Sequence, residues 1–125
     1  MAYVYADNVV EESTTTTTGA YQLGGVPSTG QAPGVQTWVA GVGNGNSHDF
    51  FAYEVGGTAW ERGQGKVVAG SPNTLVRAKI YSSSNSDAPV DWTGKTVRIR
   101  AIKSAKAERI ALNRVHLLLS NAGVI

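Results

Sequence analysis

The sequence contains no cysteine, only two histidines and no long apolar run. Without cysteine, neither a disulfide framework nor a thiolate metal site can form. No apolar run approaches the ~20 residues that a membrane-spanning helix needs. Residues 2–10 also lack the basic start of a signal peptide, and Asp7 interrupts their apolar character. The sequence therefore predicts neither a membrane protein nor a cleaved leader.

Charged residues are also scarce, at 16%, and they are unevenly distributed. Residues 1–62 carry six acidic side chains and one basic side chain, a net charge of −5. Residues 63–125 carry ten basic and three acidic side chains, a net charge of +7. Strands that interleave within one domain would bring the two signs together, and contacts between copies of the chain would do the same.

Glycine, in contrast, is abundant, with 15 residues, and many glycines stand between segments that suit β-strands. The clearest case is residues 50–62, where an aromatic-rich run and a return run flank Gly56-Gly57. Two glycines accept the positive φ angles of a two-residue hairpin turn. This pattern predicts a β-hairpin, and Gly63 and Gly65 are expected to separate it from another strand at residues 66–69.

Two later segments, residues 74–81 and 96–102, alternate between apolar and basic side chains. In the first, Val76 and the other even-numbered residues are expected to face the core, and Arg77 to face solvent. Residues 36–40, with Trp38, are predicted to form a further strand. Many short strands joined by glycine-rich turns predict an all-β fold, an antiparallel β-sandwich or jelly-roll-like domain, over residues 1–103.

Two segments are candidate contact surfaces for assembly. The threonine tract at residues 14–18 is β-branched and polar, so it is predicted to form an exposed strand or sheet edge. Residues 104–125 form a C-terminal extension that reads either as a helix or as a strand, and its apolar side would pack on the sandwich or on a neighbouring subunit. The candidate assembly contacts are Thr14, Thr16, Thr18, Leu112, Val115, Leu118 and Leu119.

Residue types for hydrolytic chemistry are present, but their spacing argues against an enzyme. Ser47, His48 and Asp49 are consecutive, and neighbours on a strand point to opposite faces, so they cannot form a relay with one another. Glu54 and Glu61 flank the predicted turn, as paired glycosidase carboxylates would, but a narrow hairpin offers little cleft for a substrate. We therefore predict no catalytic residues.

No cofactor or metal site is predicted either. The glycines at residues 41–45 resemble a phosphate loop only in composition, because the lysine of a Walker motif is missing. Asn44, Asn46 and Asp49 offer oxygen ligands, but they lack the spacing of a calcium loop. Turn formation accounts for these asparagines and glycines.

Two surface types remain. The basic cluster is Arg98, Arg100, Lys103, Lys106, Arg109 and Arg114. Aromatic residues do not interleave with these bases in the sequence, so nucleic-acid binding is not expected. The aromatic candidates for the core, or for stacking on a sugar, are Trp38, Tyr53, Trp60 and Trp92. A host-glycan-binding module is therefore an alternative function.

Three segments, residues 6–25, 53–70 and 74–97, together resemble a module that recurs in virion proteins of tailed bacteriophages. The module combines a threonine run, a Tyr…Gly…Trp-Glu hairpin with a Gly-x-Gly sequence, a Ser-Ser-Asn loop and a short Val-Asp-Trp segment. These elements fall on residues 14–18, Tyr53, Gly57, Trp60-Glu61, Gly63 and Gly65, Ser83-Ser84-Asn85 and Val90-Asp91-Trp92. The resemblance covers roughly residues 6–100.

The module occurs at the start of tail fibre and tailspike proteins and in small particle proteins. The resemblance implies a non-enzymatic structural protein of the virion, assembled in the host cytoplasm and associated with the tail as a fibre-attachment or adaptor-like module. A capsid decoration or cement protein that stabilises the head is the alternative. The expected partners are other virion proteins and further copies of the chain in a homo-oligomer.

Overall fold

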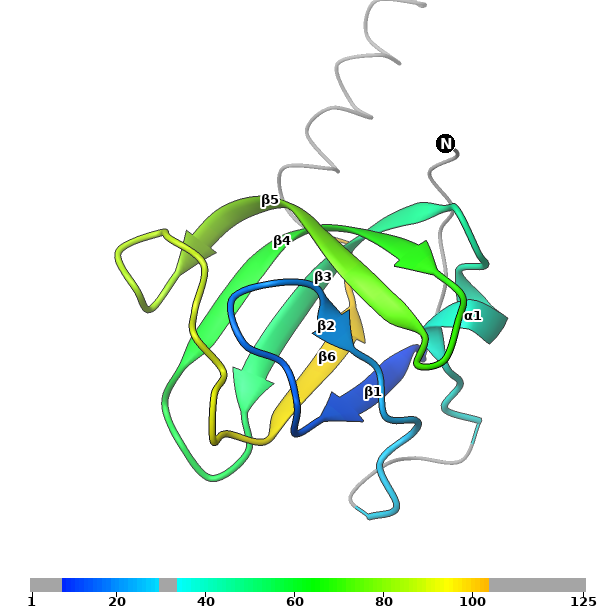
Figure 1. Ribbon diagram of the computed structural model, residues 1–125, viewed down its shortest axis with the longest axis horizontal. Helices are drawn as coiled ribbons and strands as arrows, with labels where there is room; N and C mark the ends of the chain where they lie inside the picture. Colours follow the sequence, from blue (N-terminus) through cyan, green and yellow to red (C-terminus); the bar gives the residue numbers. More distant parts are fainter. Residues whose placement is uncertain (1–7, 30–33, 104–125) are drawn as a thin grey trace, which may run out of the picture.

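The computed structural model describes residues 8–29 and 34–103, and these residues form an all-β domain with one short helix (Figure 1). The elements are β1 (Val10–Ser13), β2 (Tyr21–Gln22), α1 (Trp38–Gly41), β3 (Ser47–Glu54), β4 (Trp60–Val68), β5 (Thr74–Ser83) and β6 (Val97–Ala101). The predicted all-β class is confirmed. The predicted extension at residues 104–125 lies outside the described residues.

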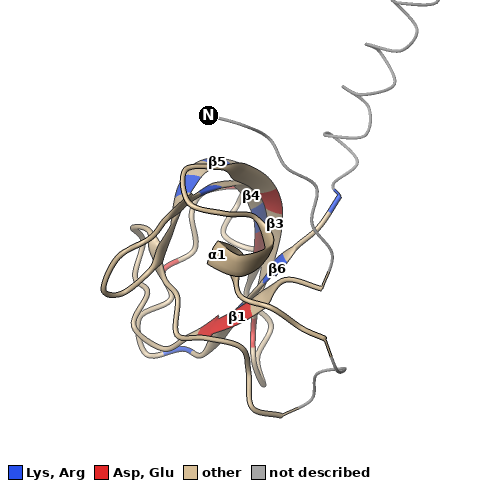
Figure 2. Ribbon diagram, turned by 90° about the vertical axis from the view of Figure 1, so that its right-hand side faces the viewer, with Lys and Arg blue, Asp and Glu red and all other residues tan. Residues whose placement is uncertain are grey.

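All six strands belong to one antiparallel sheet with the order β1-β6-β3-β4-β5-β2. The sheet curls until the residues after β2 meet β1. There, the Glu12 amide donates to the Gly25 carbonyl at 3.0 Å and accepts, through its own carbonyl, from the Gly24 amide at 2.8 Å. The result is a barrel-like domain, and Figure 2 shows α1 at the near end of the curled sheet.

The hairpin of β3 and β4 lies in the middle of the sheet and confirms the predicted hairpin. Its turn is longer than predicted, because Glu54 and Ala59 still pair, with the Glu54 amide donating to the Ala59 carbonyl at 2.9 Å. Four residues, 55–58, therefore make the connection. Gly56 takes a φ of +76°, whereas the φ of Gly57 lies outside the left-handed region. The prediction of a two-residue turn is therefore wrong.

The expected break at Gly63 and Gly65 is also wrong, because β4 runs unbroken through both glycines. A Cβ on Gly63 would lie 2.0 Å from the Lys79 carbonyl oxygen, and one on Gly65 would lie 2.6 Å from the Leu75 side chain. These glycines let β5 and the core approach β4 closely. They serve packing inside the barrel rather than a turn.

The first half of β5 places its side chains on the opposite faces from those predicted, whereas Lys79 is exposed and Ile80 packs against the core, as predicted. Leu75 is fully buried and the Arg77 side chain is almost so, whereas Val76 is 39% exposed. The alternation of apolar and basic residues predicted the wrong faces because a basic residue such as Arg77 is normally expected to face solvent. Two residues of β5, Ala78 and Tyr81, have no partner on β4, and these bulges shift the alternation along the strand.

The predicted strand at residues 36–40 is wrong, since this segment holds the short helix α1. The Thr37 hydroxyl caps α1 by accepting from the Ala40 amide at 3.2 Å. Trp38 is fully buried, and its indole donates to the Ile99 carbonyl at 3.1 Å. A four-residue helix is shorter than the pattern that would reveal it in a sequence.

The core fills the inside of the curled sheet. In β6, Val97 and Ile99 are fully buried and Arg100 is exposed, which confirms the predicted alternation there. The core residues are Val9, Tyr21, Leu23, Trp38, Val42, Phe50, Ala52, Val67, Leu75, Val90, Trp92, Val97 and Ile99. No helix within residues 8–29 and 34–103 has the length and apolar character to cross a membrane.

Candidate functional site

The threonine tract is a loop between β1 and β2, not the predicted strand. Thr16 is buried, and its hydroxyl accepts from the Gln22 amide at 2.9 Å and bonds to the Ser13 hydroxyl at 2.9 Å. Thr14 and Thr18 are exposed. Side-chain hydrogen bonds to the backbone, rather than a strand ladder, hold the loop in place.

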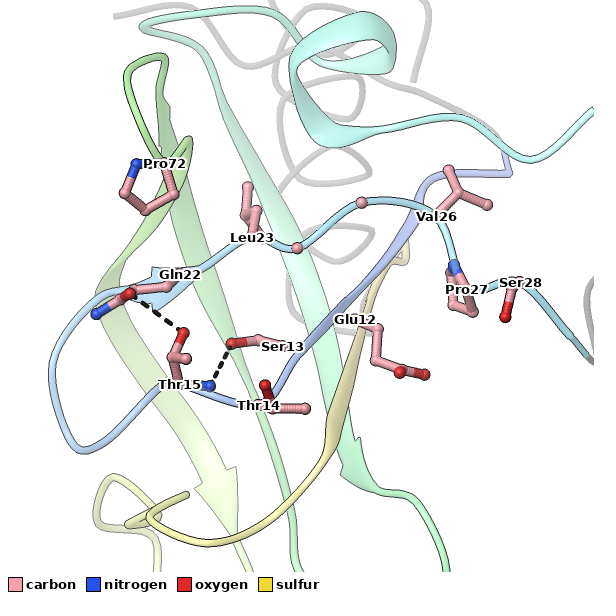
Figure 3. Close-up of a pocket in the computed structure, with 12 residues that line it drawn as sticks. Glu12, Ser13, Thr14, Thr15, Gln22, Leu23, Val26, Pro27, Ser28 and Pro72 are labelled. Atoms are coloured by element: carbon pink, nitrogen blue, oxygen red, sulfur yellow. Dashed lines mark hydrogen bonds between the residues drawn. The ribbon is translucent and has the colours of Figure 1, made fainter.

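Beside this loop lies a groove of about 430 Å³ at the seam where the sheet closes (Figure 3). Its walls include hydroxyl, amide and carboxylate groups from Thr14, Thr15, Gln22 and Glu12. The Thr15 hydroxyl donates to the Gln22 side-chain oxygen at 3.1 Å. The groove is lined by polar groups suited to a polar chain, and none of the described residues that line it is aromatic.

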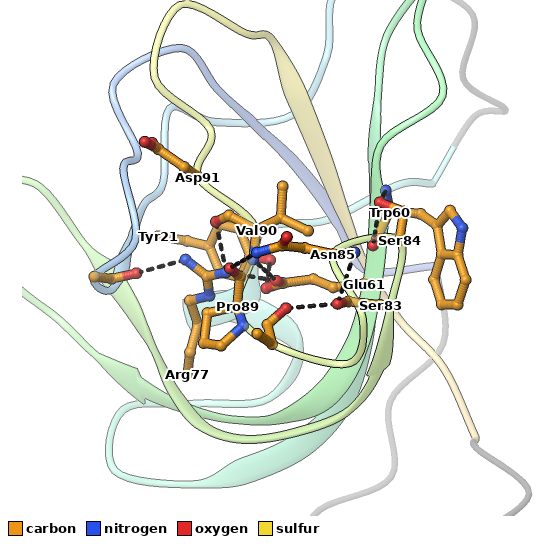
Figure 4. Close-up of polar contacts among 12 residues, drawn as sticks. Tyr21, Trp60, Glu61, Arg77, Ser83, Ser84, Asn85, Pro89, Val90 and Asp91 are labelled. Carbon is orange, nitrogen blue, oxygen red and sulfur yellow. Dashed lines mark hydrogen bonds and ion pairs between the residues drawn. The ribbon is translucent and has the colours of Figure 1, made fainter.

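The fully buried carboxylate of Glu61 on β4 bonds to residues of three separate segments (Figure 4). It forms an ion pair with Arg77 of β5 and accepts a hydrogen bond from the Tyr21 hydroxyl. It also accepts from the Val90 amide at 2.9 Å. Burial, together with the Glu61 carboxylate, raises the pKa of Tyr21 far above its ordinary value, so this hydroxyl stays a donor.

Arg77 extends this buried network to two loops. Its guanidinium donates to the Thr17 carbonyl at 3.2 Å, to the Gly19 carbonyl at 3.3 Å and to the Val90 carbonyl at 2.9 Å. The guanidinium carbon also lies 5.1 Å from the centre of the Tyr21 ring. One ion pair between two strands therefore positions the loop after β1 and the loop after β5.

The loop after β5 is further held by serine and asparagine side chains (Figure 4). The Ser83 hydroxyl accepts from the Asn85 amide at 3.1 Å and donates to the Ala88 carbonyl at 2.5 Å. The Asn85 side chain donates to the Pro89 carbonyl at 3.0 Å, and the Ser84 hydroxyl accepts from the Trp60 amide at 3.0 Å. This loop thus returns to the start of β4.

The residues of the Trp-Glu, Ser-Ser-Asn and Val-Asp-Trp segments therefore meet in one place, although about thirty positions separate the first from the last. Trp92 is fully buried beside Tyr21, with ring centres 6.4 Å apart. We call Tyr21, Glu61, Arg77 and Val90 the buried network. The sequence pattern indicated Glu61 only as a carboxylate beside the predicted turn, because nothing local to it reveals a partner sixteen residues away.

A second buried carboxylate, Glu11 of β1, was also missed. Its two oxygens accept from the Gly25 amide at 3.0 Å and from the Trp38 amide at 2.8 Å. Burial raises the pKa of Glu11, and the two backbone hydrogen bonds partly oppose this rise. Glu11 thereby fixes the start of α1 and the chain after β2 against β1.

The residues considered for hydrolysis are buried or separately paired. His48 is buried on β3, and its Nδ1 bonds to the Asp49 carbonyl at 2.8 Å. The Asp49 side chain is also buried and accepts from the Tyr81 hydroxyl at 3.2 Å. Glu54 lies 3.7 Å from Lys95, whereas Glu61 belongs to the buried network, so these two carboxylates do not share a site.

The asparagines considered as metal ligands form hydrogen bonds within turns. The Asn44 side-chain oxygen accepts from the Ala69 amide at 2.9 Å, and the Asn46 side chain donates to the Val42 carbonyl at 2.8 Å. In the described part of the chain, no three His, Cys, Asp or Glu side chains gather as metal ligands would.

The four aromatic candidates divide between two environments. Trp38 and Trp92 are fully buried in the core. Tyr53 and Trp60 face each other across β3 and β4 on the outer surface of the sheet, where both are partly exposed. The three tryptophans therefore do not form one platform on which a sugar ring could stack.

Aromatic and basic side chains do interleave on that outer surface. The outer aromatic–arginine face consists of Phe51, Tyr53, Trp60, Arg62, Arg98 and Arg100. Across the sheet, Phe51 stands opposite Arg62 on one side and Arg100 on the other. Figure 2 shows basic residues along β4, β5 and β6. Sequence order separated these residues, and strand pairing brings them together.

Within the outer aromatic–arginine face, the aromatic rings and one arginine form a stack. The Phe51 and Tyr53 rings stack with their centres 5.7 Å apart. The Arg62 guanidinium carbon lies 5.5 Å from the centre of the Phe51 ring and 5.1 Å from that of Trp60. Such a packed cluster of arginine and aromatic residues is typical of the energetic centre of a binding surface.

No protein-family model, curated protein or solved structure matches this chain.

Several candidate residues lie outside the described residues, namely Lys106, Arg109, Leu112, Arg114, Val115, Leu118 and Leu119. The groove, the buried network and the outer aromatic–arginine face are thus the features from which a function can be argued.

Proposed function

We propose that this chain is a non-enzymatic structural protein of a bacteriophage particle, which joins the tail apparatus as a fibre-attachment or adaptor-like module. The observation that carries the proposal is the buried network. The segments that resemble the virion module are the ones that meet there: Glu61 follows Trp60, Val90 precedes Trp92, and Ser84 bonds to the strand start at Trp60. The Trp-Glu, Ser-Ser-Asn and Val-Asp-Trp segments thus make the domain rigid and form no reactive site.

The hydrogen bonds of the network support a scaffold role. The Glu61 carboxylate receives all its hydrogen bonds from within the domain and is fully buried, so it has no surface to offer a substrate. Its partners tie the two long loops to the sheet. A domain whose loops are fixed before it binds loses less conformational entropy on assembly, which favours stable contacts between subunits.

Location on the particle tests this proposal directly. Antibodies raised against the purified chain would be applied to intact particles of the phage that encodes it, and bound antibody would be imaged by electron microscopy with gold particles. Label on the tail is the expected result. Label on the head would instead support the alternative, a capsid decoration protein.

The control for the labelling is antibody that has first been absorbed with the purified chain, which should give no label. Mass spectrometry of the same purified particles supplies a second measurement, namely whether they contain the chain. Particles that contain none of the chain, and that bind no more antibody than the control, would overturn the proposal that it is a virion protein.

A further inference from the structure

Two arginines of the outer aromatic–arginine face have no acidic partner among the residues that the structure describes. Arg98 forms an ion pair with Glu12 at 3.1 Å and is largely covered. Arg62 and Arg100 are exposed, and no carboxylate within residues 8–29 and 34–103 forms an ion pair with either one. Because Arg62 and Arg100 both stand opposite Phe51, two uncompensated positive charges flank one aromatic residue.

The position of Arg62 leaves its hydrogen-bond donors available. Its guanidinium lies over the rings of Phe51 and Trp60, which restrains the side chain. A guanidinium that stacks on aromatic rings still directs its N–H groups outward from its edge, and this planar fork matches a carboxylate in two parallel hydrogen bonds. The stacking therefore orients a group suited to binding an anion.

We propose that the outer aromatic–arginine face binds a carboxylate-rich segment of a different protein. The charges of Arg62 and Arg100 complement carboxylates, and the rings of Phe51, Tyr53 and Trp60 supply apolar contact area beside them. Aromatic residues and arginine are enriched in protein–protein interfaces and carry most of the binding free energy there. The inference takes from the proposed function only that the domain acts by contacting another protein.

The packing of the rings favours a protein over single-stranded nucleic acid. Bases bind such surfaces by stacking on open aromatic faces. Here Arg62 covers one face of both Phe51 and Trp60, and Phe51 also stacks against Tyr53. A base that stacked on the covered ring faces would have to displace these contacts, whereas a carboxylate binds the edge of the guanidinium and leaves them intact.

Charge also argues against a second copy of the same face as the partner. A two-fold symmetric dimer places each patch against the identical patch of its partner. Arg62 and Arg100 would then face the same two uncompensated arginines, and like charges at an interface disfavour the complex. The partner segment must carry the opposite charge.

The test measures binding of defined probes to the full chain by fluorescence anisotropy. The first probe is a short fluorescein-labelled peptide that alternates glutamate with alanine, and the control peptide carries glutamine in place of each glutamate. The third probe is a labelled single strand of thymidine nucleotides. We expect the glutamate peptide to bind at least about tenfold more tightly than the glutamine peptide, since charged hydrogen bonds are lost in the latter.

Single substitutions locate the binding site. Arg62→Gln and Arg100→Gln should each weaken glutamate-peptide binding by about tenfold. The matched control is Lys79→Gln, which removes one positive charge from an exposed residue of β5 and should change binding by less than about twofold. Circular dichroism confirms that each variant folds. Arg100 lies on the exposed side of its strand and stacks on no ring of a described residue, so Arg100→Gln tests the site even if Arg62→Gln unfolds.

Three outcomes would overturn the inference. The glutamate and glutamine peptides could bind equally, Lys79→Gln could weaken binding as much as Arg62→Gln, or the thymidine strand could bind more tightly and lose affinity with the same arginines. The last outcome would assign the face to nucleic acid. None of these results alters the location of the chain on particles, so failure here and failure of the proposed function are distinguishable.

Discussion

Replacing Glu61 by glutamine should remove a large share of the stability of this domain. Glu61→Gln preserves side-chain size, removes the charge and turns one of the two acceptor oxygens into a donor NH2 group. Arg77 would then hold a positive charge inside the barrel, where its side chain is 4% exposed, without a counter-ion. Breaking a buried ion pair from one side costs about 3–5 kcal/mol of the free energy of unfolding. Small domains have about 5–15 kcal/mol in total.

The matched control is Glu54→Gln, the same chemical change on the neighbouring strand of the same hairpin. Glu54 pairs with Lys95 at 3.7 Å, and the Lys95 side chain is 37% exposed. Solvent screens such a pair, so its loss should cost about 0–1 kcal/mol. Urea denaturation followed by tryptophan fluorescence gives the free energy of unfolding of each variant by linear extrapolation.

A double variant separates the ion pair from its surroundings. Glu61→Leu with Arg77→Met replaces both charges by apolar groups, which often restores the stability lost when a single partner is removed. We expect the double variant to be more stable than Glu61→Gln. If Glu61→Gln and Glu54→Gln destabilise the domain equally, the buried network contributes no more to the free energy of unfolding than a surface ion pair does.

Three further predictions concern packing and ionisation. Gly63→Ala should lower the free energy of unfolding by about 1–3 kcal/mol, because its methyl group would meet the Lys79 carbonyl; Gly19→Ala, with nothing within 4 Å, should cost less than about 0.5 kcal/mol, and equal melting temperatures would contradict this. Folding raises the pKa of Glu11 above its ordinary 4.5, so the folded chain keeps that proton longer than the unfolded chain; stability relative to Glu11→Gln should fall as pH rises above 4.5, and a flat difference in urea unfolding would refute it. Burial, aided by Asp49, raises the pKa of Tyr81 to about 12, so ultraviolet titration should show a tyrosine that ionises near pH 12 and is lost in Tyr81→Phe; an unchanged curve would count against it.

The sequence was most informative where the pattern is local. The central hairpin and the alternation of β6 followed from aromatic and branched residues spaced two apart, and the structure confirms both. Prediction failed where a residue's role depends on a distant strand. Gly63 reads as a turn residue until β5 is seen to pass against it, and Trp38 reads as a strand residue until its indole is seen to bond to Ile99.

The sequence by itself determined that this chain is an all-β protein with closely spaced turns, because strand alternation and glycine content act through the local backbone. Only the tertiary structure decided which charges lie inside. Glu61 and Arg77 look like surface residues in isolation, and each is stable inside the barrel only because the other is there. The same strand pairing set Phe51 between Arg62 and Arg100 on the outside. Burial of a charge is a property of a pair, and a pair separated along the chain exists only once the sheet has formed.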